Sequence, residues 1–521
     1  MLSGFMATGK STVGRMLSES LRVPFVDTDA VIADETGKTV GEVFASEGEG
    51  RFRDRETALV LPMLEDPTPR VICFGGGTVT IPRVRHRALE RTTVVTLTAT
   101  AETIVERVPS LPDRPNLLTS SPLDRARDLL AQRREIYAEC HATVSTEGRT
   151  PEQIAARVLE VAQLDALAMP LGARSYVVEL TTEDPARLTA ALRELQPSSL
   201  VVVTDTNVDA ARGAWLADAT ANITCPRVTI PITPGEQSKT LATVSKIWDA
   251  ALGASVDRDT VVIAFGGGVV GDLAGFAAST LLRGMRCVQI PTSLLAMVDS
   301  SVGGKTAFDH AAGKNLIGTF FQPSRVVVDL EHLTTLPERE RAAGLAEVVK
   351  IALVCDGTLL EVLERNTTAI RAGYTDMLRD VVRAAVEAKI RVVRDDEREG
   401  GVRALLNLGH TVGHALEAHG GFARLLHGEA VAIGTVVEIA ATERLGLTPA
   451  GNAARAKALF EALGLPTEAS VDELRAAWPY VLSDKKRAST TLKLPIVTAP
   501  GSGTVAKVGI DALMGAVLSP S

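Results

Sequence analysis

The sequence predicts an α/β protein in which two domains built on parallel sheets precede a mainly helical domain. Short apolar strands alternate with amphipathic helices through the first two domains, whereas the pattern after residue 338 is mostly helical. Each of the first two domains also has a glycine turn between a strand and a helix, which suits phosphate binding. We expect domains at residues 1–162, 173–325 and 326–521, with a linker at residues 163–172.

The composition limits the classes of partner. A formal net charge of -8 leaves no basic surface for nucleic acid or an anionic membrane. No apolar run reaches membrane-spanning length, and the N-terminus lacks a signal-peptide pattern. The five cysteines are scattered without paired spacing, which favours buried thiols in a reducing compartment. We therefore expect a cytoplasmic protein that binds small molecules.

The first glycine turn, Gly4 to Ser11, matches the phosphate-binding pattern G-x-x-x-x-G-K-S and precedes a helix-like stretch. Backbone N–H groups of such a loop face phosphate oxygens at a helix N-terminus. Lys10 would reach the terminal phosphates, and Ser11 would coordinate Mg²⁺ together with Asp27, which ends a short strand. Arg114 lies in a polar stretch that suits a mobile lid closing on the phosphoryl group.

Other residues of this half suit a substrate with hydroxyl and carboxylate groups. Asp29 follows the short strand, and the stretch Glu49–Glu56 offers guanidinium groups for a carboxylate. A buried strand ends in the turn Gly75–Gly77, where a ligand can approach the backbone. Arg133 lies in a predicted helix, where a solvated charged face is the alternative interpretation.

With these motifs, residues 1–160 resemble shikimate kinase, a small P-loop kinase that uses ATP and Mg²⁺. The resemblance implies shikimate contacts at Asp29, Arg53, Gly76 and Arg133. It implies that Lys10 and Arg114 act in catalysis, and it gives a larger set of ATP and phosphate contacts. That set is Gly4, Ala7, Thr8, Gly9, Lys10, Ser11, Thr12 and Arg114.

Two features depart from this family. Ala7 stands where the family has glycine, a mild change if the backbone φ there is negative. Only Met1-Leu2-Ser3 precedes Gly4, although a P-loop normally follows a buried strand of about four to eight residues. We expect either that the chain starts further upstream, or that the sheet lacks its central strand and the kinase is weakened.

The second domain has the βαβ rhythm of a parallel sheet after a Pro/Gly-rich boundary that follows a helix-like stretch at residues 151–168. Strands are expected at residues 175–180, 199–204, 228–232, 260–265 and 287–290, and helices at residues 185–195, 241–252 and 268–279. The second glycine turn, Gly266 to Asp272, suits the close approach of a pyrophosphate, although a plain structural turn is the alternative. The Gly/Ser-rich stretch at residues 291–318 predicts a binding loop whose Lys305 and Lys314 suit a phosphorylated acid, rather than a flexible loop.

Four of the eight histidines lie between His410 and His427. His410 and His414 are four residues apart and would share one helix face, so their spacing nominates them as a zinc-ligand pair. Surface or hydrogen-bonded core histidines are the alternative. Upstream, Glu347 and Lys350 lie three apart on an otherwise apolar helix, where a carboxylate needs a lysine or a metal as partner.

Together these motifs make residues 172–500 closely similar to 3-dehydroquinate synthase. The resemblance implies a Rossmann-like α/β NAD-binding domain and a helical metal-binding domain. It also implies a zinc- or cobalt- and NAD-dependent conversion of 3-deoxy-arabino-heptulosonate 7-phosphate to 3-dehydroquinate and phosphate. The zinc ligands become Glu347, His410 and His427, whereas His414 is left beside the substrate phosphate.

The resemblance also assigns the other contacts of this half. The implied NAD contacts are Asp205, Asn207, Glu236, Lys239, Gly267, Gly268, Val269, Asp272, Thr292, Ser293 and Lys314. The implied substrate contacts are Arg283, Asp299, Lys305, Asn315, Lys350, Lys389, Arg403, Asn407, His414 and one of Lys485 or Lys486, with Lys305, Glu399 and His414 in catalysis. We expect the synthase half to form a homodimer.

Three other functions fit parts of these patterns. The C-terminal half could be a metal-dependent polyol or alcohol dehydrogenase, which would release NADH, or a related sugar-phosphate cyclase. The N-terminal half could be a non-catalytic module, because its first strand is so short. The first and last of these are distinguished by NADH release and by shikimate 3-phosphate formation.

Overall fold

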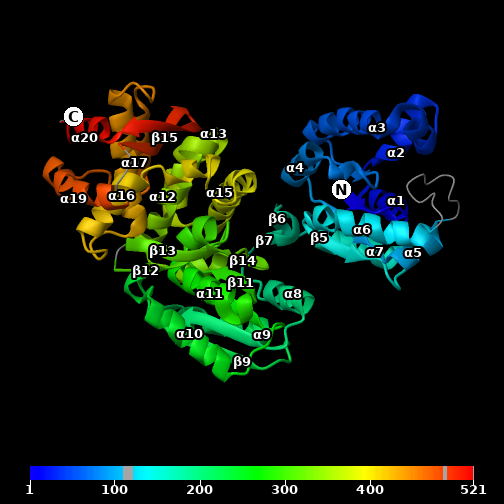
Figure 1. Cartoon of the computed structure of the whole chain (residues 1–521), viewed down its shortest axis with the longest axis horizontal. Coiled ribbons are helices and arrows are strands. Elements are labelled where there is room, and N and C mark those ends of the chain that lie inside the picture. Colours follow the sequence, from blue (N-terminus) through cyan, green and yellow to red (C-terminus); the bar gives the residue numbers. More distant parts are fainter. Residues whose placement is uncertain (109–120, 312, 485–489, 520–521) are drawn as a thin grey trace. The chain divides into compact units, whose positions relative to one another are not determined.

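The computed structural model describes residues 1–108, 121–311, 313–484 and 490–519, which form two compact units (Figure 1). The first unit is Met1–Glu179 and the second is Leu180–Ser521. Each unit contains its own parallel sheet and its own hydrophobic clusters. In the described part of the chain, no helix combines the length and the apolar character needed to cross a membrane.

The first unit is built on five parallel strands in the order β2-β3-β1-β4-β5. They are β1 (Leu2–Gly4), β2 (Phe25–Asp27), β3 (Val71–Cys73), β4 (Val95–Thr98) and β5 (Ala142–Ser145). The expectation of a sheet without its central strand is therefore wrong. The three residues of β1 are buried and pair with both β3 and β4, because neighbouring strands supply the hydrogen-bond partners that a short strand needs.

Helices cover both faces of this sheet. They are α1 (Lys10–Leu21), α2 (Thr28–Thr36), α3 (Val40–Glu65), α4 (Pro82–Arg91), α5 (Ala101–Arg107), α6 (Pro122–Ala138) and α7 (Pro151–Ala162), with the single turn η1 (Thr78–Thr80). Successive residues of β3 point to opposite faces, as the strand period of two requires. Val71 and Cys73 join a cluster with α1 and α7, whereas Ile72 joins a cluster with α3, α4 and α6.

The segment between the two predicted domains is more ordered than the sequence indicates. Helix α7 ends at Ala162 rather than continuing to residue 168, and β6 (Asp165–Met169) forms inside the predicted linker. Residues 166–169 of this strand are buried. After the turn η3 (Gly172–Arg174), β7 (Tyr176–Thr181) crosses the boundary between the two units.

The second unit begins with a doubly wound sheet that contains five parallel strands in the order β14-β11-β10-β8-β9. They are β8 (Leu200–Asp205), β9 (Arg227–Ile232), β10 (Val261–Gly266), β11 (Arg286–Pro291) and β14 (Arg325–Asp329). The flanking helices are α8 (Ala186–Leu195), α9 (Thr206–Thr220), α10 (Leu241–Gly253) and α11 (Gly268–Thr280). Strands β7 to β11 correspond to the five strands predicted between residues 175 and 290. Helices α8, α10 and α11 correspond to the three predicted helices.

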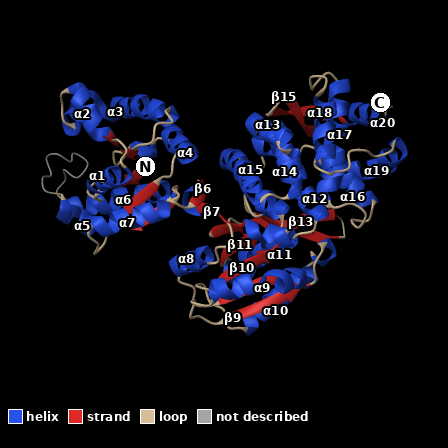
Figure 2. Cartoon of the chain, turned by 180° about the vertical axis from the view of Figure 1, so that it is seen from behind, coloured by secondary structure: helices blue, strands red, loops and turns tan. Residues whose placement is uncertain are grey.

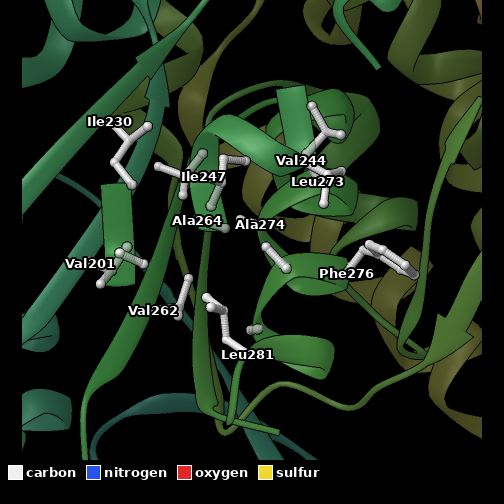
Figure 3. Packing of buried hydrophobic residues seen from close by; sticks show 14 of the residues in the cluster. Val201, Ile230, Val244, Ile247, Val262, Ala264, Leu273, Ala274, Phe276 and Leu281 are labelled. Carbon is white, nitrogen blue, oxygen red and sulfur yellow. The ribbon is translucent and has the colours of Figure 1, made fainter. Parts of the chain in front are cut away.

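The pleat of β10 separates the two hydrophobic clusters of this sheet. Val262 and Ala264 pack against Ile247 of α10 and Leu273 of α11, as Figure 3 shows. The alternate residues of the strand pack on the other face, in a cluster with α8 and α9. A strand buried on both faces explains the unbroken apolar run in the sequence.

Residues 291–318, predicted as a binding loop, have more regular structure than expected. They contain the turn η6 (Ala296–Ser300) and most of an antiparallel hairpin of β12 (Lys305–His310) and β13 (Gly313–Phe320). Thr306, Ala307 and Phe308 of β12 are buried, which anchors the hairpin to the core. Glycines and lysines disguise this strand pattern in the sequence, because both residue types are depleted in strands.

The rest of the second unit is mainly helical (Figure 2). Its helices are α12 (Glu338–Cys355), α13 (Gly357–Arg365), α14 (Thr367–Ala372), α15 (Thr375–Asp395), α16 (His410–His419), α17 (His427–Arg444), α18 (Asn452–Ala462), α19 (Val471–Asp484) and α20 (Ile510–Leu518). An antiparallel pair, β15 (Thr491–Ala499) and β16 (Ser502–Gly509), lies between α19 and α20 in the sequence. The remaining single turns are η4 (Glu236–Ser238), η5 (Leu281–Arg283), η7 (Leu330–Thr335) and η8 (Val402–Asn407).

A buried cluster of hydrogen-bonded polar side chains connects β14 to α9. Asp329 accepts hydrogen bonds from the backbone N–H of Glu183 at 2.8 Å and from Trp215 Nε1 at 2.9 Å. His332 lies edge-on against Trp215 and accepts a hydrogen bond from Arg212 Nε at 3.1 Å. Burial, with the charge of Arg212, lowers the pKa of His332 to about 4.

The lowered pKa of His332 in this cluster predicts that the second unit becomes less stable in acid. Between pH 6.5 and 4 the unfolded chain binds a proton at His332 that the folded chain does not, so stability falls as pH falls through this window. The full effect is up to about 3 kcal/mol. We expect His332→Asn, which keeps an acceptor for Arg212, to flatten the pH dependence of urea unfolding. The exposed His310→Asn should leave that dependence unchanged, and a steep slope in both variants would contradict the assignment.

Candidate functional site

The phosphate-binding loop connects β1 to α1 and is curled around the carbonyl of Phe5. Thr8 Oγ1 and Lys10 Nζ each donate to this carbonyl over 2.8 Å, and Gly9 is the N-cap of α1 with φ +86°. Ser11 Oγ donates to Asp27 Oδ2 over 2.5 Å, so the predicted magnesium pair is brought together. Lys10 Nζ and the first N–H groups of α1 therefore lie at the same end of the helix, where a phosphate could bind.

Ala7 has φ +57°, in the left-handed region. Alanine in place of glycine was expected to be a mild change only if φ were negative, so this expectation does not hold. A side chain in this region costs roughly 1 to 2 kcal/mol relative to an ordinary conformation. The loop carries this strain because the flanking strand and helix fix its ends.

The predicted shikimate contacts gather around the turn Gly75–Gly77. Arg53 pairs with Glu49 at 3.0 Å and with the buried Glu56, which Thr78 also contacts. A Cβ on Gly77 would lie 2.1 Å from Arg53 Nη2, so a side chain there would displace the guanidinium. Burial raises the pKa of Glu56, although the charge of Arg53 opposes the shift.

Helix α6 adds two donors to the same turn. Arg133 Nη1 donates to the carbonyl of Gly76 over 3.1 Å, and Tyr137 Oη donates to the same oxygen over 2.5 Å. The sequence prediction missed Tyr137 and the role of Glu56 in holding Arg53. The spacing of four between Arg133 and Tyr137 places them on one helix face and could have indicated Tyr137. The predicted lid residue Arg114 lies outside the described residues.

The predicted zinc ligands converge in the second unit. Glu347 lies in α12, and His410 and His427 are the first residues of α16 and α17. Glu347 Oε1 is 3.6 Å from His410 Nε2 and 3.4 Å from His427 Nε2, and the three ligand atoms lie within 4.8 Å of one another. Glu347 is fully buried, and Lys350 on the next turn pairs with its other oxygen.

The outer nitrogens of the two histidines have their own partners. His410 Nδ1 lies 3.2 Å from the carbonyl of Leu408, and His427 Nδ1 lies 3.2 Å from Glu417 Oε2. Such contacts fix the ring orientation and turn Nε2 toward a metal. Burial lowers the pKa of His410, whereas the adjacent carboxylates of Glu347 and Glu417 overcome burial and raise the pKa of His427 to about 10.

These residues fit a zinc ion. Both oxygens of Glu347 are buried, and within the described residues neither has a hydrogen-bond partner besides the ion pair of Lys350 with Oε2, so a cation between the two histidines would satisfy Oε1. His414, Glu417 and His427 form a second possible group. Both oxygens of Glu417 are engaged, by His427 and by Lys314 at 3.0 Å, whereas Oε1 of Glu347 faces the two histidine nitrogens, so the group with Glu347 fits better.

Four predicted substrate contacts form two polar clusters near η6 and η8. Lys389 Nζ donates to Asp299 Oδ1 over 2.6 Å. Burial lowers the pKa of Lys389 to about 8 although Asp299 opposes the shift. In the second cluster, Glu399 contacts both Lys305 and Asn407. Beside these clusters, Arg403 Nη2 donates to the carbonyl of Gly303 over 3.0 Å.

Other predicted contacts lie elsewhere or fall outside the described residues. Arg283 is exposed in η5, and no hydrogen bond or ion pair joins it to another predicted contact within the described residues. Lys485 and Lys486 lie outside the described residues. His414 lies beside the metal group, with its ring centre 5.0 Å from that of His410.

Predicted NAD contacts lie at the carboxyl ends of β8 and β10 and on the hairpin. Asp205 ends β8 and caps α9, where it accepts from the N–H groups of Asn207 and Val208 at 2.9 Å. After β10, Gly267 is the N-cap of α11, and Gly268 and Val269 form its first turn. The backbone N–H of Thr292 donates to the carbonyl of Gly266 over 3.0 Å, which brings the end of β11 beside this turn.

The hairpin connects this edge with the metal group. Lys239 pairs with Asp272 at 2.6 Å and donates to Asn315 Oδ1 over 2.5 Å. Lys314 Nζ lies 3.2 Å from Glu236 and 3.0 Å from Glu417, the partner of His427. A Cβ on Gly267 would approach Ser293 Oγ to 3.3 Å, so Ser293 also lies at this edge.

The chain matches three protein-family models. Residues 6–163 match shikimate kinase, residues 229–343 match the N-terminal part of 3-dehydroquinate synthase, and residues 344–487 match its C-terminal part. A 3-dehydroquinate synthase of Geobacter metallireducens is 44% identical over 346 residues, which cover 66% of this chain and 96% of that protein. One from Teredinibacter turnerae is 43% identical over 345 residues, 65% of this chain and 94% of that protein.

Solved structures also resemble the second unit. The 2-epi-5-epi-valiolone synthase of Streptomyces hygroscopicus subsp. jinggangensis 5008, solved with NAD⁺ and Zn²⁺ bound, is 29% identical with a TM-score of 0.59. The match covers 66% of this chain and 96% of that one. A 2-deoxy-scyllo-inosose synthase is 23% identical with a TM-score of 0.62, covers 68% of this chain and 99% of that one, and shares the fold.

The strain at Ala7 predicts a stabilising substitution. We expect Ala7→Gly to raise the free energy of unfolding of the first unit by about 1 kcal/mol, because glycine adopts φ +57° without a clash. Urea unfolding measures the change. Ala45→Gly, at an exposed site in α3, should instead lower stability by a similar amount. A loss of stability in both variants would show that Ala7 is not strained.

Proposed function

The chain belongs to the 3-dehydroquinate synthase family and carries a shikimate kinase domain before it. We propose that one polypeptide catalyses both reactions at separate sites. The first unit phosphorylates shikimate with ATP, and the second unit converts 3-deoxy-arabino-heptulosonate 7-phosphate to 3-dehydroquinate and phosphate. The single observation that carries the synthase proposal is the buried carboxylate of Glu347, whose Oε1 faces the Nε2 atoms of His410 and His427.

In the synthase site, Glu347, His410 and His427 would hold Zn²⁺, and Co²⁺ is an alternative ion. Bound zinc would lower the pKa of a substrate alcohol, and bound NAD would accept and later return a hydride. Glu417 supports this set by holding the outer nitrogen of His427, and Lys350 offsets the charge of Glu347. The chain's own part in the reaction is then to bind the substrate and to move protons.

The two polar clusters supply these functions. Lys305 and Asn407, which share Glu399, would bind substrate oxygens once the substrate competes for them. Lys389 is buried with a pKa of about 8, so it can both hold an anion and release a proton near neutral pH. His414 lies beside the metal group and is proposed to meet the substrate phosphate as it leaves.

NAD is proposed to bind at the carboxyl edge of the doubly wound sheet. The N-terminus of α11 would face the pyrophosphate, because Gly267 leaves the backbone open there. Asp205 and Lys314 lie at the same edge and would contact the rest of the dinucleotide. The similarity of the chain to named 3-dehydroquinate synthases over 96% of a relative's length favours this reaction over a polyol dehydrogenase.

In the kinase site, Lys10 would exchange the carbonyl of Phe5 for phosphate oxygens when ATP binds. Ser11 and Asp27 would share the Mg²⁺ ion, since their oxygens lie 2.5 Å apart. Arg53, Arg133 and Asp29 would hold shikimate over the turn Gly75–Gly77. A homodimer through the synthase half and a cytoplasmic location remain predictions.

Removal of one metal ligand tests the synthase site. We expect Glu347→Gln and His410→Ala to abolish stoichiometric zinc binding and synthase turnover, because two remaining ligands do not hold the ion. Zinc per chain is measured after dialysis, and kinase activity of the same preparation shows that the chain is intact. His419→Ala, at an exposed histidine of the same helix α16, is the matched control and should keep its zinc. Full zinc content in either ligand variant would refute the metal assignment.

A paired assay tests whether both sites act in one chain. We expect Lys10→Met to lower the rate of shikimate 3-phosphate formation by at least about 100-fold, while the synthase turnover stays normal. Wild-type synthase turnover should show no net NADH absorbance, because the hydride is returned. Accumulation of NADH equal to product would favour the dehydrogenase alternative. Absence of shikimate 3-phosphate with wild-type protein would favour a non-catalytic first unit.

A further inference from the structure

Helix α16 begins at a metal ligand and cannot cap its own N-terminus. Its N-cap is Gly409, which has no side chain, and the first turn is buried. The early N–H groups of a helix have no partner inside the helix and need one from elsewhere. In most helices a Ser, Thr, Asp or Asn at the N-cap supplies it.

The packing around Gly409 excludes any of these residues. Gly409 has φ +80°, which residues with a side chain rarely adopt. A Cβ there would lie 2.2 Å from Thr435 Oγ1 and 2.7 Å from the carbonyl of Val431, both in α17. The close contact between α16 and α17 therefore requires glycine and removes the usual source of a cap.

Glu438 of α17 provides the missing acceptors. Its carboxylate is fully buried, with Oε2 accepting from the N–H of Gly409 and Oε1 from the N–H of Val412, each over 2.9 Å. Both oxygens thus point at the first turn of α16, and the negative charge lies at the positive end of the helix dipole. Glu438 thus binds the N–H groups of Gly409 and Val412, which flank His410 in the first turn of α16.

We propose that Glu438 is a positioning residue for the metal centre. It sets the start of α16, and with it the place of His410, relative to His427 at the start of α17. Because α17 carries both His427 and Glu438, one rigid helix determines the separation of the two histidine ligands. The proposal rests on the metal assignment made above, and Glu438 itself does not touch the ion or the substrate.

Replacing the carboxylate by an amide tests this role. Glu438→Gln leaves one acceptor oxygen and turns an NH₂ group toward an N–H of α16. We expect zinc affinity, measured by competition with a chelating dye, to fall about 10- to 100-fold, as for other residues that orient metal ligands. The cobalt-loaded variant should also show a changed visible absorption spectrum, because His410 is displaced from its place in the ligand set.

Glu443 offers a matched control on the same helix. Its Oε1 accepts from the N–H of Ala453 over 2.9 Å in the first turn of α18, which begins after the N-cap Gly451. Glu443→Ala therefore removes a similar helix cap supplied by α17, but α18 carries no predicted metal ligand. We expect it to lower stability while leaving zinc affinity and the cobalt spectrum unchanged.

The outcomes separate the proposals. Wild-type zinc affinity and cobalt spectrum in folded Glu438→Gln protein would overturn the positioning role, even where stability falls. Equal losses of zinc affinity in the Glu438 and Glu443 variants would also overturn it. If Glu438→Gln does not fold, Glu438→Asp keeps the buried charge on a shorter side chain, and the same fall in zinc affinity is required. A wild-type chain that binds no zinc through Glu347 and His410 would instead refute the metal assignment.

Discussion

A charged carboxylate that is removed from water must be compensated, and the second unit is arranged around that requirement at Glu347. The residue is fully buried, and neither of its oxygens accepts a hydrogen bond within the described structure. Leaving a buried ion uncompensated costs several kcal/mol. Lys350 supplies one positive charge one turn away, but two histidine nitrogens also face the same carboxylate. This combination is costly for a stable core and reasonable for a metal site, because a divalent cation converts the cost into binding energy.

The requirement explains the close packing of α12, α16 and α17. Ligands from three helices can meet only if the helix axes approach closely, and glycines permit that approach. A Cβ on Gly428 would lie 1.8 Å from the carbonyl of Ala343 in α12, and one on Gly434 would lie 2.1 Å from the carbonyl of Gly409. The same closeness prevents α16 from carrying its own N-cap. The buried Glu438 is thus a consequence of the glycine contacts, and the same contacts bring the proposed metal ligands together.

Local patterns in the sequence were sufficient for much of the fold but for only part of the sites. The strands and helices between residues 175 and 290 follow from apolar runs and period, and the glycine turns mark where phosphates would bind. The spacing of His410 and His414 indicates a metal, but neither candidate metal group among the described residues contains both, because His427 comes close through tertiary packing that no local period encodes. Strand β1 was underestimated for the same reason: its partners β3 and β4 lie far along the chain. Glu56, Tyr137 and Glu438 act on residues of other elements, so only the folded chain identifies them.

The positions of the assigned residues also bear on why one chain carries both reactions. Every proposed kinase contact lies between Gly4 and Arg133, within the first unit, and every proposed synthase contact lies beyond Asp205, within the second. Neither site therefore needs a residue from the other unit to complete it. The two reactions are not consecutive, so the product of one site is not the substrate of the other. Linkage then places one copy of each proposed site on every chain, rather than a path from the product of one to the substrate of the other.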